Sequence, residues 1–439
     1  MRKTTVAFFP LFFLFLSLSI FQIPAVADGT AEHVPPQLIL PNPLTPQLSA
    51  DGKTLFNGLP LKAVVNDPTP STTLRRIPAP AHLTAEPEAA TASFSITYVL
   101  NGGKDAWGEE CSTFPESAKA AFNATANIWS NTLHSSVPIT IRACWASLSD
   151  PNILGYSGSS TVRDFSGATQ SNTWYSFSLA NALHGSDLSP GSTINDYDMH
   201  ITYNTNFSWY FGTDGNTPLA QHDFMSVVLH EIAHGLNFSG AMNYASGQGS
   251  WGYDGYPNIY DVFMRDGLGK QLITYTSPST ALGSALVSNN IWFHGRQAMA
   301  TNGNQRVKMY APATWSGGSS YSHLDYATFN NTSNQLMVYA ISNGESIHDP
   351  GAVTRGLLSD LGWSTSSDPP PPSSSSPWVL FQAAINAASS TPPPPPVVLP
   401  QWGVSSAICC SASSLTFTVT SSKITKKTYV ANCQTAGTW

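Results

Sequence analysis

The stretch from residue 224 to residue 238 limits most strongly what this chain can fold into, because its pattern requires a buried helix. Apolar residues recur at helical spacing at Phe224, Val228 and Ile232. Asp223, directly before them, is a residue type that caps helix N-termini. The sequence therefore predicts a helix that begins after Asp223 and packs one apolar face into a core.

Three polar residues interrupt this apolar helix in the pattern His-Glu-x-x-His: His230, Glu231 and His234. Residues four apart on a helix share a face, so the two imidazoles can reach one metal ion. Zinc in such a site lowers the pKa of a bound water, and Glu231 lies where it can take the water's proton. The alternative interpretation is a pair of core histidines, one turn apart, that bind no metal.

A zinc site of this kind needs a third protein ligand. Between His234 and Gly344 the chain contains no glutamate, and Gly240 stands where a histidine six positions after His234 would be. Several residues remain as candidates for the third ligand: His294, His323, His348, Asp254, Asp261 and Asp266.

Four patches of the chain resemble, in order, the leishmanolysin-type metzincins. They are His230 to Phe238 (HEIAHGLNF), Ser322 to Leu324 (SHL), Leu336-Met337, and Thr354 to Trp363 (TRGLLSDLGW). In that family a long insertion separates the helix from a third histidine, which a Met-turn follows. The resemblance extends over about residues 95 to 363, although only these patches are specific. It implies that His323 is the third ligand and that Met337 is the Met-turn residue beneath the histidines.

Two further residues are interpreted through this resemblance. Asn237 stands where the family usually has glycine, three residues after the second helical histidine. Asparagine is the residue that best tolerates the left-handed conformation after glycine, so we expect the turn out of the helix to form. Tyr339 is a candidate hydrogen-bond donor to the oxyanion, as in the astacin branch of the metzincins, or otherwise an ordinary buried tyrosine.

The other candidates have simpler interpretations. Asp261 is a candidate ligand of an aspartate-completed site, but a supporting or helix-capping role fits it better. We expect His200 and His294 to be structural or exposed, and Asp360 to be a structural hydrogen-bonding residue.

The N-terminal part of the chain predicts a secretory leader. Residues 1–27 have a charged start, an apolar middle and an Ala-Val-Ala ending, which is typical of a signal peptide, the alternative being an uncleaved membrane anchor. Residues 28–92 form a proline-rich pro-segment or leader without cysteine, with a possible processing point at Arg75-Arg76. If this leader inhibits, it has to block the cleft, because it has no thiolate to offer to a metal.

The rest of the chain divides by composition. Residues 93–363 are predicted to form a metzincin-like catalytic domain, residues 364–403 a Pro/Ser-rich linker with a short apolar segment, and residues 404–439 a small cysteine-containing tail. Within the catalytic domain, ordered structure is expected to begin near Phe94.

The patterns along this domain predict its first elements. They indicate a strand over residues 94–100, a helix that starts with a capping box at Thr113 to Glu116, and strands over residues 137–145 and 196–203 before the motif helix.

The five cysteines of an exported chain predict disulfides rather than redox chemistry. Cys111 and Cys144 are expected to pair. Cys409, Cys410 and Cys433 are close to the C-terminus, where one bridge to Cys433 would leave one cysteine free.

Together these patterns predict an α+β fold of the zincin type, with a twisted mixed sheet, an active-site helix and a mostly irregular or helical lower subdomain. The predicted activity is that of a secreted, zinc-dependent endopeptidase, located outside the cell, in a periplasm or at the cell surface. Its protein or peptide substrates would lie extended in the cleft, beside an edge strand such as residues 196–203.

Composition also bears on the partners. With 10% charged residues and a net charge of -7, the chain lacks the basic stripes that nucleic-acid binding needs, and no membrane association is expected after signal cleavage. The alternative from another functional class is a secreted non-catalytic zinc-containing binding or adhesion module, in which a fourth protein ligand would close the metal site.

Overall fold

The computed structural model describes the middle of the chain and parts of both ends. Described are residues 47–48, 55–57, 62–68, 71–84, 91–189, 196–366, 414–421 and 424–432. The predicted signal peptide, most of the predicted linker, and Cys409, Cys410 and Cys433 lie outside these residues.

A mixed sheet is the centre of the fold. Its strands are β3 (Ala63–Asn66), β5 (Phe94–Tyr98), β6 (Cys111–Ser112), β8 (Ile139–Ala146), β9 (Ile153–Gly158) and β12 (Met199–Asn204). The order is β3-β9-β12-β8-β5, with β6 also paired to β8. β5, β8 and β12 are parallel, whereas β9 runs antiparallel to β12, and β3 runs antiparallel to β9.

The helices lie before, between and after these strands in the chain, and α4 packs against β3, β9 and β12. They are α1 (Ala81–Thr84), α2 (Glu116–Thr132), α3 (Phe177–His184), α4 (Phe224–Gly235), α5 (Ile259–Val262), α6 (Thr280–Leu286), α7 (Arg296–Thr301), α8 (Tyr326–Phe329), α9 (Ala352–Leu361) and the 3-10 turns η2 (Leu272–Thr274) and η3 (Gln335–Met337). The fold is therefore α+β with a mixed sheet, as the sequence predicted.

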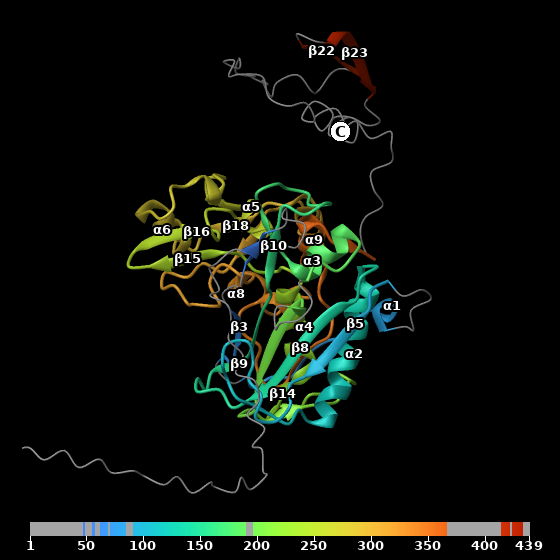
Figure 1. The fold of residues 1–439 in the computed structure, drawn as a ribbon, viewed down its shortest axis with the longest axis vertical. Helices are drawn as coiled ribbons and strands as arrows, with labels where there is room; N and C mark the ends of the chain where they lie inside the picture. Colours follow the sequence, from blue (N-terminus) through green and yellow to red (C-terminus); the bar gives the residue numbers. More distant parts are fainter. Residues whose placement is uncertain are drawn as a thin grey trace, which may run out of the picture. The chain divides into compact units, whose positions relative to one another are not determined.

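Most of the remaining strands are short, β22 and β23 being longer, and they pair locally or across long loops. They are β1 (Gln47–Leu48), β2 (Leu55–Asn57), β4 (Arg75–Ile77), β7 (Leu133–His134), β10 (Thr161–Arg163), β11 (Trp174–Ser176), β13 (Trp209–Tyr210), β14 (His222–Asp223), β15 (Met242–Ala245), β16 (Gln248–Trp251), β17 (Met264–Asp266), β18 (Ile291–Phe293), β19 (Val307–Met309), β20 (Glu345–Ile347), β21 (Ser364–Thr365), β22 (Ser414–Ser421) and β23 (Ile424–Asn432). Figure 1 shows β5, β8 and α2 in one half of the folded region, and β15, β16 and α6 in the other half.

The strand expected over residues 196–203 exists as β12, but it is not an edge strand. β12 lies between β9 and β8, so both of its backbone edges are already hydrogen-bonded. A substrate strand has no free edge to pair with there, and that part of the expectation is wrong. The sequence did not reveal β9, because glycines and serines dilute its strand pattern.

Ordered structure begins well before Phe94, contrary to expectation. β3 joins the central sheet, β4 pairs in parallel with β20, and α1 packs against α2 with Leu83 fully buried. These leader segments are too short to show a periodicity of their own. Their hydrogen-bonding partners come from residues far along the chain, which composition does not reveal.

The helix expected after Thr113 is α2, and its predicted apolar positions Phe122, Ala126 and Trp129 are buried. Its start differs from the expectation. The N-cap is Pro115, which has no side-chain acceptor, and no side chain caps this helix end. The predicted capping box is therefore wrong, since Thr113 lies two residues before the cap.

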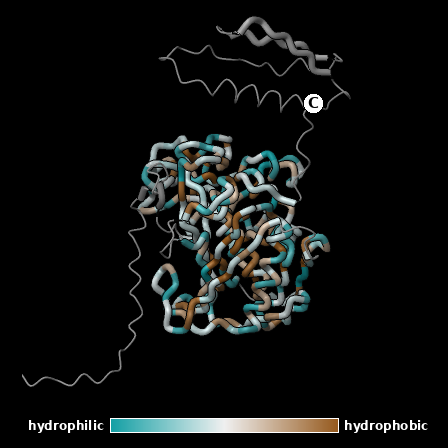
Figure 2. Tube along the Cα trace, turned by 45° about the vertical axis from the view of Figure 1, so that its right-hand side comes forward, coloured by the Kyte–Doolittle hydropathy of each residue, from teal (hydrophilic) through white to brown (hydrophobic). Residues whose placement is uncertain are grey.

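The motif helix α4 is the most deeply buried element of the fold. All of its residues are buried, and it packs against β9, β12 and α2. Phe224 at its first turn lies among aromatic rings, with centroid distances of 4.9 Å to Tyr203 and 5.4 Å to Trp209. Hydrophobic segments gather inside the folded region in Figure 2. No helix of the described residues is long and apolar enough to cross a bilayer.

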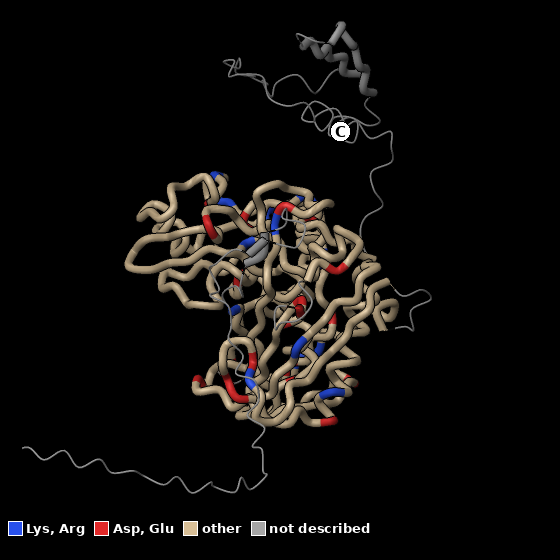
Figure 3. Tube along the Cα trace, viewed as in Figure 1, with Lys and Arg blue, Asp and Glu red and all other residues tan. Residues whose placement is uncertain are grey.

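Two observations concern polar and covalent features. Cys111 and Cys144 form a disulfide between β6 and β8, the pairing that the sequence predicted. Charged side chains are sparse along the tube in Figure 3. Several carboxylates are nevertheless buried among the described residues, and each of them needs an explanation: Asp105, Asp198, Asp223, Glu231, Asp261, Asp325 and Glu345.

Candidate metal centre

Three histidines from distant parts of the chain meet in the interior. α4 provides His230 and His234, and the loop before α8 provides His323. The Nε2 atoms of His230 and His234 are 3.0 Å apart, and each lies 3.1 Å from Nε2 of His323. None of the three side chains is more than 1% exposed. Within the described residues, this is the one cluster of histidine, cysteine or carboxylate groups that could hold a metal ion.

The other ring nitrogen of each histidine contacts a backbone carbonyl. Nδ1 lies 2.7 Å from the oxygen of Leu336 for His230, and 2.8 Å from that of Phe238 for His234. For His323 the partner is the oxygen of Ser319, at 2.7 Å. A carbonyl oxygen only accepts, so each Nδ1 carries the hydrogen and each Nε2 is left with a lone pair.

Three lone pairs that face one another at this distance repel unless a cation lies among them. Burial lowers the pKa of His230 to about 4, and burial together with the neighbouring histidines lowers the pKa of His234 well below its usual value. A proton therefore does not supply the cation at neutral pH. Neutral imidazoles whose Nδ1 atoms donate to carbonyls are the arrangement that zinc sites use, so the residues present fit a zinc ion.

The turn after α4 builds the support for His234. Asn237 has a φ of 79°, the left-handed conformation that the sequence predicted for it. This reversal brings the N–H of Phe238 to the oxygen of Ala233 at 3.0 Å. The carbonyl of Phe238 then accepts from His234. The side-chain oxygen of Asn237 accepts from the N–H of Ser176 at 2.6 Å, which fixes the turn from outside.

The segment predicted as a Met-turn joins the other two histidines. Met337 is fully buried at the end of η3, directly after Leu336, whose carbonyl accepts from His230. The carbonyl of Met337 accepts from the N–H of Leu324, the residue after His323, at 2.8 Å. One short turn therefore positions both rings through its backbone. The role of the Met337 side chain as a floor beneath the histidines stays a prediction.

Glu231 follows His230 on α4 and is fully buried, and its carboxylate is not a member of the histidine cluster. Neither of its carboxylate oxygens has a hydrogen bond of standard length and angle to the described residues. Burial raises its pKa to about 8, opposed by the nearby hydroxyl of Ser157 and the N–H of Val65. A carboxylate that titrates near neutrality is suited to exchange protons with a reacting group.

Gly155 places the backbone of β9 next to this carboxylate. A Cβ at Gly155, on β9, would lie 3.7 Å from Oε1 of Glu231 and 3.0 Å from the carbonyl oxygen of Thr202. The backbone of β9 can thus approach Glu231 closely.

Asp261, the candidate for an aspartate-completed site, is not part of the cluster. It forms a capping box with Asn258 at the start of α5 and accepts from the N–H of Ala241 at 3.0 Å and the hydroxyl of Tyr321 at 2.9 Å. Burial raises its pKa to about 6. Its carboxylate is thus a structural cap, the role that fitted it better from the sequence.

The remaining candidates also lie apart from the three histidines. His294 is exposed, and the carboxylate of Asp266 accepts from the N–H groups of Leu268 and Lys270. Asp254 is not a member of the metal-competent cluster either. Asp360 accepts from the N–H of Ala298 at 2.8 Å at the start of α7, the structural role expected of it.

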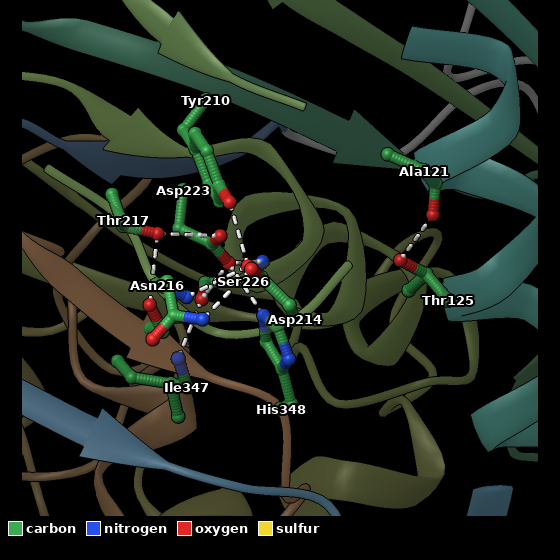
Figure 4. A network of polar contacts seen from close by, with 11 residues as sticks. Ala121, Thr125, Tyr210, Asp214, Asn216, Thr217, Asp223, Ser226, Ile347 and His348 are labelled. Carbon is green, nitrogen blue, oxygen red and sulfur yellow. Dashed lines mark hydrogen bonds and ion pairs between the residues drawn. The ribbon is translucent and has the colours of Figure 1, made fainter. Parts of the chain in front are cut away.

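His348 belongs to a different buried polar group, at the N-terminal end of α4. Its Nε2 lies 2.8 Å from Oδ2 of Asp223, the carboxylate that caps the helix by accepting from the N–H of Ser226 (Figure 4). The predicted helix cap at Asp223 is confirmed, and Nε2 of His348 is hydrogen-bonded to this cap.

The ring of Tyr339 lies in an aromatic stack. Its centroid is 4.3 Å from that of Tyr310 and 5.3 Å from that of Tyr326. The backbone carbonyl of Tyr339 accepts from the N–H of Asn66 at 2.9 Å. The proposed role of the Tyr339 hydroxyl as an oxyanion donor stays a prediction.

Sequence reasoning missed the groups that orient the histidines. They are the backbone carbonyls of Leu336, Phe238 and Ser319. A carbonyl is present at every residue, so no residue type marks those that turn toward a ring. Only the left-handed position at Asn237 gave an indirect signal.

Comparisons with known proteins add little to this geometry. A family model described as SPBPB7E8-like matches residues 61–246, which is less than half of the chain and includes β3 and α4 but not His323. No curated protein and no solved structure matches the chain.

Proposed function

We propose that this protein is a secreted zinc-dependent endopeptidase of the zincin type, related to the leishmanolysin-type metzincins. One observation carries the proposal. Three buried Nε2 lone pairs converge on one point, and Glu231, the residue after His230 on α4, has a buried carboxylate without a standard hydrogen bond among the described residues. Buried acceptors without partners are unfavourable, unless a cation binds the three nitrogen lone pairs and a hydrogen-bond donor reaches the carboxylate.

In the proposed reaction, His230, His234 and His323 hold the metal. Zinc, when bound, supplies a Lewis acid that polarises the scissile carbonyl and lowers the pKa of water. With the metal in place, Glu231 would accept a proton from the attacking water and donate it to the leaving nitrogen as the peptide bond breaks. The carbonyls of Leu336, Phe238 and Ser319 keep the three rings in place throughout.

The proposed substrates are proteins or peptides, and the proposed location is outside the cell, in a periplasm or at the cell surface. The Cys111–Cys144 disulfide supports an oxidising compartment. The competing candidate, a non-catalytic zinc-containing binding or adhesion module, would need a fourth protein ligand to close the site. The metal-competent cluster has three members among the described residues, which favours an open position and hydrolysis.

The deciding experiment replaces Glu231 by glutamine in the full chain. We expect Glu231→Gln to retain one zinc per chain by mass spectrometry and to lose casein cleavage by about 1,000-fold or more, because the general base is gone. Cleavage is measured before and after limited trypsin digestion, with trypsin then blocked by a serine-protease inhibitor.

The matched control is Glu345→Gln. Glu345 is also buried, but its carboxylate accepts from the N–H of Ser342 at 2.9 Å, away from the histidines. This variant should cleave casein like the parent. Equal cleavage by Glu231→Gln would refute the proposed base.

A further inference from the structure

A segment of the leader lies in an extended conformation beside the candidate metal centre. β3 pairs antiparallel with β9, with Val64 opposite Tyr156 and Val65 opposite Gly155. This pairing covers the outer edge of β9, so β3 is the last strand on that side of the sheet.

The other edge of β3 is hydrogen-bonded as well, to segments that carry the metal centre. The N–H of Val64 donates to the oxygen of Gly318 at 3.0 Å, and that of Asn66 donates to the oxygen of Tyr339 at 2.9 Å. The N–H of Ile341 donates back to the oxygen of Asn66 at 3.0 Å. β3 is therefore hydrogen-bonded along both edges. One edge pairs with β9, and the other contacts Gly318 and the segment that follows the predicted Met-turn.

Two contacts connect β3 with the proposed reacting groups. Val65 lies opposite Gly155, the glycine whose Cβ position is 3.7 Å from Oε1 of Glu231, and β3 packs against α4. Ser319 provides the second contact. Its hydroxyl accepts from the side chain of Asn66 at 2.9 Å, and its carbonyl supports His323.

The groove fits this segment closely. Val65 is fully buried and Ala63 is 3% exposed, whereas Lys62 places its ammonium 4.2 Å from the ring centroid of Tyr156. A Cβ at Gly318 would lie 2.5 Å from Cγ2 of Val64, and Gly318 has a φ of 82°. Gly318 therefore leaves room for β3, because a side chain at this position would collide with Val64.

We propose that β3 occupies the groove in which a peptide substrate binds, so that residues 62–67 are an internal occupant that keeps the site closed. The groove offers main-chain hydrogen bonds on two sides, antiparallel to β9 and parallel to the segment at Ala340. This is how an added β-strand is recognised. That the groove binds a peptide substrate rests on the proposed function, whereas the proposal that β3 fills the groove does not.

The occupant also indicates what the groove selects. The main-chain contacts are independent of sequence, but Val65 is enclosed next to Glu231. We expect a β-branched aliphatic residue at this position and exclusion of acidic ones. The block is not a thiolate bond to the metal, because the first cysteine of the chain is Cys111. The predicted processing point at Arg75-Arg76 lies after β3, so a cut there would leave residues 62–67 held only by non-covalent contacts.

The test opens the groove in the full chain and offers it a substitute strand. Val65→Asp introduces a charge into the enclosed position, and Asn66→Pro removes the N–H that donates to Tyr339. The matched control is Thr72→Asp, at an exposed residue of the same leader. The probe is a fluorescent peptide with the sequence of residues 61–68 (LKAVVNDP), and its binding is followed by anisotropy in chains that also carry Glu231→Gln.

We expect both groove variants to bind the peptide about 10-fold more tightly than the Thr72→Asp control, because the competing tethered strand is displaced. With Glu231 present, Val65→Asp should also cleave casein faster than Thr72→Asp. Folded groove variants, verified by circular dichroism, that bind no better than the control would overturn the inference. So would failure of both variants to fold, since β3 would then be an integral strand. If the groove variants bind the peptide but cleave no casein, the proposal that β3 occupies a peptide-binding groove stands, and the proposed peptidase activity is refuted.

Discussion

The two ends of α4 are both buried and both hold a histidine and a carboxylate, yet they differ in how their hydrogen bonds are balanced. At the N-terminal end, Oδ2 of Asp223 accepts from Ser226 and His348, and Oδ1 accepts from the hydroxyl of Thr217 at 2.8 Å. Ser226 in turn accepts from the N–H of Ile347 at 2.6 Å. Figure 4 shows that these side chains point toward one another around Asp223.

At the C-terminal end the balance is different. His230, His234 and His323 have satisfied Nδ1 atoms and opposed Nε2 lone pairs, and both carboxylate oxygens of Glu231 lack a standard partner. Unpaired buried acceptors are costly, so they persist where a ligand completes them. The comparison teaches that the balance of donors and acceptors, rather than burial or residue type, separates a structural polar cluster from a candidate reaction centre.

The largest effect should follow from removing a ligand at the C-terminal end. His323→Ala is expected to weaken zinc binding by more than about 100-fold, because two imidazoles remain of three. Zinc content after dialysis against a weak chelator measures this. Asp261→Ala is the control and should keep its zinc although it loses a buried cap. Loss of zinc from Asp261→Ala alone would assign the third ligand to the aspartate and break the comparison.

Removal of the carboxylate at the N-terminal end should affect stability instead. Asp223→Ala leaves Ser226, Thr217 and His348 without their acceptor, which we expect to lower the free energy of unfolding by about 3 to 5 kcal/mol. Urea unfolding measures it. Folded Asp223→Ala should still bind one zinc.

The control for this variant is Asp214→Ala, in the exposed part of the same group of residues in Figure 4, where a much smaller loss is expected. A zinc defect in folded Asp223→Ala would show that the two ends of α4 are coupled.

Acid should weaken the N-terminal end of α4 through His222. Burial lowers the pKa of His222, next to Asp223, from 6.5 to about 4, and Nε2 of His222 is 3.7 Å from Asp67, whose pKa burial raises. Below pH 6.5 the unfolded chain binds a proton at this histidine that the folded protein excludes down to about pH 4. Stability that is present above pH 6.5 is therefore lost as the pH falls through this window.

We expect a loss of about 1 to 3 kcal/mol between neutral pH and pH 4 from this group. Unfolding midpoints of the parent and His222→Gln, compared at pH 7 and pH 5, isolate it. An equal acid response in both proteins would show that His222 does not contribute.

The smallest effect concerns the turn that supports His234. Asn237→Gly keeps the left-handed conformation but loses the side-chain bond to Ser176, whereas Asn237→Ala loses the bond and adds backbone strain. Asn237→Ala should therefore be less stable than Asn237→Gly by about 1 kcal/mol. Thermal unfolding of the two variants measures the difference. Equal stability would mean that backbone conformation contributes little at this turn.

Local patterns predicted a good part of this site correctly. The spacing of His230 and His234, the cap at Asp223 and the left-handed Asn237 follow from residues within one or two helical turns of each other. Local patterns failed where the partner was distant. The capping box predicted at Thr113 does not form, because the N-cap is Pro115, and β12 proved to be a central strand because β9 pairs with it.

The sequence by itself determined the helix, two candidate ligands on one of its faces and the carboxylate between them in the chain, because helical periodicity is a local property. It left six candidates for the third position, and only the resemblance to a family pointed to His323. The tertiary structure alone brought His323 to α4, through backbone pairing of Tyr310 with His323 and of Leu324 with Met337. It also placed β3 between β9 and the segment at Ala340. Such contacts join residues far apart in the chain through main-chain groups that all residues share, so no sequence pattern records them.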